Sequence, residues 1–208
     1  MMKRRKITLC LLTAGLLATG IGGWNLYREA SQIYDETIRL HILAASDSER
    51  DQALKLTVRD ALIDEVAEIT AEVSDKAAGE EILKENIPYL TQIAKEALKR
   101  EGCDEDVAIT LTCEYYPTRD YGHLRLPAGE YTSLQVKIGA AEGQNWWCIL
   151  FPPVCTSAAR AEKAMAETGF SKSQIRLLTE DEDPRYTLKF RVVEQFAKIK
   201  RSVKELFR

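Results

Sequence analysis

The hydrophobic residues of this sequence change their spacing at Gly102, and this change constrains the fold more than any other feature. From Ser48 to Gly102 apolar residues recur every three or four positions, which is typical of amphipathic helices. From Val107 to Tyr116 they alternate with polar residues, which is typical of a strand with one buried face. Strands in mid-sequence with helices on either side predict an α+β fold, with an antiparallel sheet of four to five strands and helices packed mainly on one face.

Local signals predict where the helices begin. Ser48, with Asp51 three residues later, forms a capping box for a long first helix. Asp75 can cap a second helix, and Pro88 favours the first turn of a third. Further helices are expected at 158–168, 171–178 and 187–207.

Five segments have the composition of strands. They are 38–43, 107–116, 121–126, 131–138 and 146–151. The alternation in the second of these predicts that Cys113 lies on the buried face. The turn between Gly139 and Gly143 predicts a hairpin that pairs the last two strands.

The N-terminal region has the layout of an export segment. Four basic residues at positions 3–6 precede the uncharged run 7–23. This run suits a short membrane span as well as a signal peptide, so a retained anchor and a cleaved signal both stay open. Either one leaves the basic end in the cytoplasm and the body outside it. We expect residues 1–24 to be a signal peptide or anchor, 25–37 a connector and 38–208 a single extracytoplasmic domain.

Charge limits the partners that the body can have. The chain has a net charge of −3, and without the four basic residues of the N-terminal region the rest has −7. A surface that binds nucleic acid needs clustered lysine and arginine. We therefore expect no nucleic-acid partner.

Four cysteines lie outside the export segment: Cys103, Cys113, Cys148 and Cys155. Exported proteins form disulfides readily, so all four are candidates, and three pairings are possible. Cys148 and Cys155 are seven residues apart across two prolines, which makes a local bridge plausible. Buried free thiols are the alternative.

The sequence contains no recognisable catalytic or metal-binding motif. Neither histidine, His41 or His123, belongs to a His-x-x-x-His motif, and no Cys-x-x-Cys occurs. A half-buried histidine with a hydrogen-bond partner explains His41. Ser46 and Asp47 stand beside Ser48 like a nucleophile near an acid, but the Gly-x-Ser-x-Gly turn is missing and a helix cap explains Ser48. We expect no catalytic residue, no metal and no cofactor, and hence no enzyme.

Trp146 and Trp147 are adjacent in an expected strand. Adjacent strand residues point to opposite faces, so one indole belongs to the core and the other lies on the second face. There the ring contacts solvent, a partner or a covering segment. Large exposed aromatic side chains are frequent binding anchors.

Three stretches of the sequence resemble the stage II sporulation protein R family. They are Arg39–Asp60, Pro127–Tyr131 and Asn145–Cys155, with Ala45 where the family pattern usually has asparagine. The resemblance implies a secreted signalling protein that is made in the forespore and exported toward the space between forespore and mother cell. There it would activate a membrane-embedded aspartic protease, which then cleaves the pro-form of the early mother-cell sigma factor.

With this function in view, we predict a surface that binds the protease. Its candidate residues are His41, Ser46, Asp47, Ser48, Trp146 and Trp147. No small-molecule substrate is expected, and membrane contact is expected only through the N-terminal segment. The alternative function is a secreted hydrolase or cell-wall-modifying enzyme in which His41 and His123 act with a carboxylate.

Overall fold

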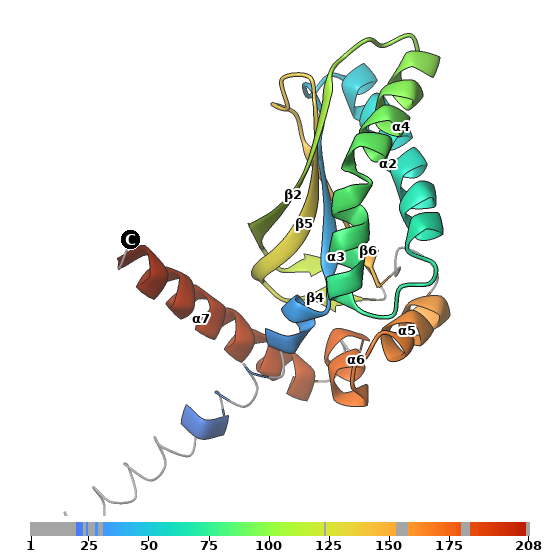
Figure 1. The fold of residues 1–208 in the computed structure, drawn as a ribbon. Coiled ribbons are helices and arrows are strands. Elements are labelled where there is room, and N and C mark those ends of the chain that lie inside the picture. Colours follow the sequence, from blue (N-terminus) through green and yellow to red (C-terminus); the bar gives the residue numbers. More distant parts are fainter. Residues whose placement is uncertain are drawn as a thin grey trace, which may run out of the picture.

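The computed structural model describes residues 20–22, 24, 28, 31–122, 124–152, 158–179 and 184–206. Four strands form the main sheet, and two short strands form a second one (Figure 1). The main sheet has the order β2-β5-β1-β6, with bounds β1 Ile38–Leu43, β2 Val107–Tyr116, β5 Gly129–Ile138 and β6 Asn145–Phe151. The second sheet pairs β3 (Arg119–Asp120) with β4 (Arg125–Leu126).

The predicted α+β class is confirmed, but the prediction of an antiparallel sheet is wrong for one strand pair. Strand β1 runs parallel to β5, whereas β1 with β6 and β2 with β5 are antiparallel. The predicted hairpin between β5 and β6 is also wrong, because β1 lies between these two strands. Alternation of apolar residues shows which face of a strand is buried, but it does not show which strands are neighbours.

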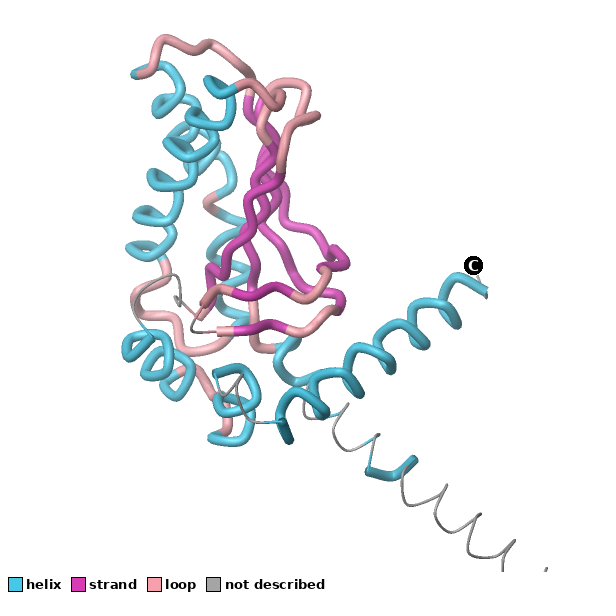
Figure 2. Tube along the Cα trace, turned by 180° about the vertical axis from the view of Figure 1, so that it is seen from behind, coloured by secondary structure: helices cyan, strands magenta, loops and turns pink. Residues whose placement is uncertain are grey.

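Three helices cover one face of the main sheet, as Figures 1 and 2 show. They are α2 (Glu49–Ile69), α3 (Lys76–Glu85) and α4 (Ile87–Arg100). The predicted caps are present, because the side chains of Ser48 and Asp75 accept hydrogen bonds from the first turns of α2 and α3. Pro88 lies in the first turn of α4, where its missing N–H costs nothing.

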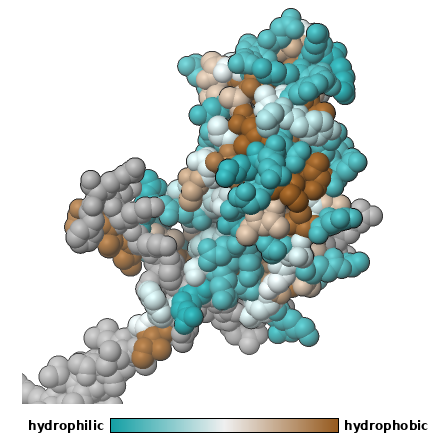
Figure 3. All heavy atoms as spheres, viewed as in Figure 1, coloured by the Kyte–Doolittle hydropathy of each residue, from teal (hydrophilic) through white to brown (hydrophobic). Residues whose placement is uncertain are grey.

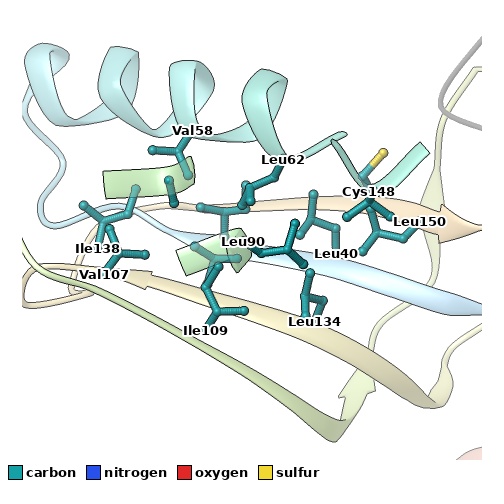
Figure 4. Close-up of a cluster of buried hydrophobic side chains, with 14 of the residues drawn as sticks. Leu40, Val58, Leu62, Leu90, Val107, Ile109, Leu134, Ile138, Cys148 and Leu150 are labelled. Carbon is teal, nitrogen blue, oxygen red and sulfur yellow. The ribbon is translucent and has the colours of Figure 1, made fainter. Parts of the chain in front are cut away.

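The main core lies between these helices and the sheet (Figure 4). Val58 and Leu62 of α2 and Leu90 of α4 point toward Leu40 and Leu134 in the two central strands. All five side chains have no measurable exposure. Burial of such side chains provides roughly 1.5–3 kcal/mol each, so this layer contributes substantially to the stability of the sheet.

The remaining helices lie at one end of the sheet. Helices α5 (Ala158–Glu167) and α6 (Lys172–Thr179) build a second core with Leu126 and Ile149. Helix α7 (Pro184–Leu206) extends away from this end (Figure 1). Within the described part of the chain, no helix is long and apolar enough to cross a membrane.

Strand β2 changes its buried face along its length. Val107 and Ile109 are buried toward the helices, but Cys113 on the same side is exposed and Tyr116 on the opposite side is buried. The prediction of a buried Cys113 is therefore wrong. Packing against α4 ends near Leu111, which is only partly buried, so β2 leaves the helical layer beyond that residue.

Candidate functional site

The two tryptophans of β6 point to opposite faces of the sheet, as strand geometry predicts. Trp146 packs against the main core, and the guanidinium of Arg59 lies 4.5 Å from the centre of its ring. Trp147 lies on the other face, against His41 and Tyr116. Both rings are half-buried, and neither indole N–H has a hydrogen-bond partner among the described residues. Ring contacts therefore position these side chains.

Trp147 lies in a setting of aromatic and cationic groups. Its ring centre is 4.8 Å from that of His41 and 4.9 Å from that of Tyr116, with the indole and tyrosine rings nearly perpendicular. The guanidinium of Arg119 lies 4.3 Å from the centre of the indole ring, a distance at which a cation–π interaction is favourable. The indole is therefore partly covered by a side chain from the second sheet.

His41 has both ring nitrogens engaged by side chains of two other strands of the main sheet, β2 and β6. Its Nδ1 lies 3.0 Å from a carboxylate oxygen of Glu114, and its Nε2 lies 2.7 Å from the side-chain oxygen of Asn145. Gln135 donates a hydrogen bond to the other oxygen of Glu114. This confirms the interpretation of His41 as a half-buried strand histidine with hydrogen-bond partners. We call His41, Glu114, Tyr116, Gln135, Asn145 and Trp147 the His41 cluster.

The environment of Glu114 favours its ionised form. Burial raises the pKa of this carboxyl group, but hydrogen bonds from His41 and Ser133, the charge of His41 and a hydrogen bond from Tyr116 together lower it. The net result is a pKa below the usual value of 4.5. Glu114 is therefore a fixed hydrogen-bond acceptor near neutral pH and holds the imidazole of His41 in place.

Arg39 of β1 lies next to the cluster. It is a charged side chain with no measurable exposure. Its Nε donates a hydrogen bond to the carbonyl oxygen of Cys148 (3.0 Å), and its Nη2 donates to the hydroxyl of Tyr121. The guanidinium carbon is 4.3 Å from the ring centre of Tyr116 and 5.0 Å from that of Tyr131. Aromatic faces thus stabilise the buried charge and connect the strands below the His41 cluster.

The tyrosines around Arg39 remain neutral. Burial raises the pKa of Tyr116 and Tyr121, and it raises the pKa of the fully buried Tyr131 well above the usual value. The hydroxyl of Tyr131 donates to the carbonyl oxygen of Pro127 at 2.7 Å, and the hydroxyls of Tyr116 and Ser133 lie 2.6 Å apart. These hydroxyls are engaged in hydrogen bonds within the protein.

The serines and aspartate of the predicted site support a loop. The carboxylate of Asp47 accepts a hydrogen bond from the backbone N–H of Gln144 (2.7 Å), and the hydroxyl of Ser46 donates to Asp51 (2.5 Å). Ser48 caps α2. A Cβ atom at Gly143 would lie 2.2 Å from the carbonyl oxygen of Ser46, so only glycine allows this close approach. The turn formed by Ser46 to Ser48 thus fixes the position of the segment with Gly143 and Gln144, which crosses the end of β1.

Lys55 of α2 also stabilises the segment that crosses the end of β1. The residue as a whole is almost fully buried, and its ammonium group donates hydrogen bonds to the carbonyl oxygen of Gln144 (2.9 Å) and the side-chain oxygen of Gln52 (2.5 Å). Burial lowers the pKa of Lys55, and the charge of Asp47 raises it in part. Sequence spacing showed neither this contact nor the burial of Arg39.

The cysteine predictions are corrected in part. Cys103 and Cys113 are free thiols. Cys103 is buried in the main core, whereas Cys113 is exposed on β2, so the two thiols lie in different environments. Cys148 is disulfide-bonded. Cys155 lies outside the described residues, so its pairing with Cys148 stays a prediction.

The structure brings together only part of the predicted site. His41 and Trp147 are in contact, whereas Trp146 lies on the helical side and the Ser46–Ser48 turn lies beyond the end of β1. Sequence reasoning missed Glu114 and Asn145. The alternation in β2 was a usable signal for Glu114, because it placed this residue on the face opposite Val107.

The arrangement favours binding over acid–base chemistry. Both nitrogens of His41 already have protein partners, so the imidazole has no free position for a substrate proton. Among the described residues, no group of three or more His, Cys, Asp or Glu side chains could hold a metal ion. His123 lies outside the described part of the chain, so the alternative of a His41–His123 hydrolase stays untested.

Comparison with known proteins places this chain in a family. The profile of the family "Stage II sporulation protein R" matches residues 34–161. Stage II sporulation protein R of Bacillus subtilis (strain 168) is 36% identical over 188 residues, which cover 86% of this chain and 84% of that protein. The chain belongs to the stage II sporulation protein R family. No solved structure matches it.

The stage II sporulation protein R profile covers the whole main sheet. All residues of the His41 cluster fall within 34–161, whereas α6 and α7 lie beyond it. Membership of the stage II sporulation protein R family supports a role in sporulation, and the family name indicates a regulatory or signalling protein rather than an enzyme.

Proposed function

We propose that this chain is an exported signal of sporulation that activates a membrane-embedded aspartic protease, which then processes the precursor of the early mother-cell sigma factor. Membership of the stage II sporulation protein R family supports the sporulation role. The basic residues 3–6 and the uncharged run 7–23 support export across the forespore membrane into the intermembrane space. Signal cleavage and retention as an anchor are both compatible with this proposal.

The surface that engages the protease is the His41 cluster. The observation that carries this assignment is the half-buried Trp147, on the sheet face opposite the main helical layer. On the same face of the sheet, Thr110 lies opposite Gln135 of the cluster, and Lys137 lies two residues further along β5. Both side chains are exposed, so a partner can approach the cluster from this side. A large aromatic ring with a polar surround is typical of binding hot spots.

Activation follows from a shift between two arrangements of the protease. A ligand that binds the active arrangement more tightly increases its population, and no chemistry by the ligand is needed. The hydrogen bonds of His41 and the contacts of Trp147 with Tyr116 hold the surface in one shape before binding. Such preorganisation reduces the entropy cost of association.

A processing assay with the protease, the sigma-factor precursor and full-length variants tests the proposal. Trp147→Ala should reduce the cleaved fraction at limiting activator by roughly tenfold or more, as expected for a hot-spot tryptophan. Tyr89→Ala is the matched control, because Tyr89 is a 43% exposed aromatic residue on α4, on the helical side. Circular dichroism must show that both variants remain folded.

A second pair of variants separates recognition from packing. Thr110→Arg adds a large side chain to the exposed surface near the cluster, and Ala53→Arg adds the same side chain to the exposed side of α2. The first should block activation and the second should not. If Thr110→Arg and a folded Trp147→Ala protein both activate normally, the protease docks elsewhere.

A further inference from the structure

Helix α7 has an exposed apolar stripe that faces away from the domain. Ile199, Val203 and Leu206 are 57%, 50% and 83% exposed and recur at helical spacing. Val193 and Ala197 are buried. Successive residues of a helix are rotated by about 100° around its axis. The centre of the stripe therefore lies roughly 150° around the helix axis from the centre of the face that includes Val193, Ala197 and Arg201. Hydrophobic spheres are visible along the described part of α7 in Figure 3.

The inner face of α7 is already occupied. Thr118 donates a hydrogen bond to the carboxylate of Glu194, and the guanidinium of Arg201 lies 4.7 Å from the ring centre of Tyr115. These contacts hold the helix against the end of β2 with its apolar stripe outward. Rotating α7 to bury the stripe would break these contacts. The stripe therefore belongs to the outer surface of the folded domain.

The charge of α7 differs in sign from that of the rest of the chain. Residues 184–206 contain seven Lys or Arg and two Asp or Glu, a net charge of +5, which leaves −8 for the rest of a chain with −3 in total. Arg191 and Lys198 are exposed and lie beside the stripe. A helix with an apolar stripe flanked by cations is typical of segments that lie in the interface of a bilayer with anionic lipids.

The position of α7 in the molecule is consistent with binding to a bilayer. Ala197 and Arg201 line one hollow of about 570 Å³ together with Trp24 and Arg28. These last two residues directly follow the uncharged run 7–23, the segment expected to enter a membrane. Two copies of a helix with a charge of +5 repel each other, which disfavours self-association through this stripe.

We propose that the outer face of α7 binds the surface of an anionic lipid bilayer through Ile199, Val203 and Leu206, with Arg191 and Lys198 at the level of the headgroups. The helix lies in the interface and does not cross the bilayer, because nine of its 23 residues are charged. This second membrane contact adds to the one expected from the N-terminal segment. It orients the domain relative to the bilayer.

Hydrogen exchange of the full-length protein with lipid vesicles tests this contact. The run 7–23 is itself expected to enter any bilayer, so the readout is the exchange of the α7 amides and not total binding. Vesicles that contain phosphatidylglycerol should slow exchange at 191–206, and pure phosphatidylcholine vesicles should do so much less. Each cation contributes about fivefold to partition onto an anionic surface, so Arg191→Gln with Lys198→Gln should cost on the order of 25-fold.

Matched variants make the result decisive. Ile199→Gln with Val203→Gln should weaken partition of α7 by on the order of 30-fold, because both side chains lose about half of their burial gain. Leu56→Gln, at an exposed position of α2, and Lys99→Gln with Lys163→Gln should leave α7 protection unchanged.

Three results would overturn the proposal. They are equal protection of α7 by both kinds of vesicle, protection that survives Ile199→Gln with Val203→Gln, and protection that appears without lipid as the protein or the protease is concentrated. The last result would assign the stripe to a protein partner. The measurements with vesicles contain no protease, so their outcome is independent of the proposed activation.

Discussion

The two faces of the main sheet are stabilised by different forces. On the helical face, Leu40 and Leu134 pack against aliphatic side chains of α2 and α4. On the other face, Arg39 and Glu114 are held by directed hydrogen bonds and aromatic rings. Apolar burial is non-directional and tolerates many sequences, whereas hydrogen bonds and ring contacts need particular partners. The second face therefore depends more than the first on the identity of each side chain.

Loss of a side chain from the helical face should have the largest effect. Leu40→Ala leaves a cavity in the centre of β1, where Leu40 has no measurable exposure. We expect it to lower the free energy of unfolding by about 2–5 kcal/mol, measured by urea denaturation. Leu56→Ala on the exposed side of α2 is the control and should cost less than about 0.5 kcal/mol. An equally small loss for Leu40→Ala would show that the helices do not form the main core.

The adjacent residue of the same strand tests the other face. Arg39→Ala removes the hydrogen bonds to Cys148 and Tyr121 and the stack on Tyr116. Loss of a buried charge offsets part of this, so we expect a loss of about 1.5–3 kcal/mol in the same denaturation experiment.

Arg39→Lys sharpens this test. It keeps the charge but not the planar stack, and it should recover less than half of the loss. If Arg39→Lys is as stable as the wild type, charge alone is sufficient at this position, and the two faces differ less than the contacts indicate.

The smallest expected effect depends on pH. Because the pKa of Glu114 is lowered in the folded protein, its stabilising contribution is fully present above about pH 4.5 and is lost as pH falls through the lowered value. Glu114→Gln should cost about 0.5–1 kcal/mol at pH 7, after allowance for partial solvent screening, and less at pH 3. Urea denaturation at the two pH values measures this difference.

The double variant assigns the cause. If His41 provides the main favourable contact of Glu114, the pH-dependent part should shrink when Glu114→Gln is made in a His41→Gln background. A pH dependence that is identical in both backgrounds would contradict the pairing.

The sequence predicted local structure better than the arrangement of strands. Capping by Ser48 and Asp75 and the position of Pro88 depend on neighbours in the chain, so their interpretation was correct. The insertion of β1 between β5 and β6 depends on contacts about 100 residues apart, and alternation in a strand contains no information about them.

The same distinction applies to the candidate site. Strand parity alone was enough to separate Trp146 from Trp147. The partners of His41 come from β2 and β6, and they follow only from the register His41↔Trp147 and the strand order. The burial of Arg39 required the tyrosines of β2 and β5 to meet above it, which no local pattern shows.

The central place of β1 also determines when the sheet can form. A chain that emerges N-terminus first presents β1 early, but its two neighbours, β5 and β6, follow roughly 90 residues or more later. Until β5 has emerged, the first strand has two open edges, and its edge toward β6 stays open until Phe151 follows. An open edge is exposed to proteases and to wrong pairing. The complete main sheet can therefore form only after β6 has emerged. A chain that is truncated or stalled before β6 cannot display the His41 cluster.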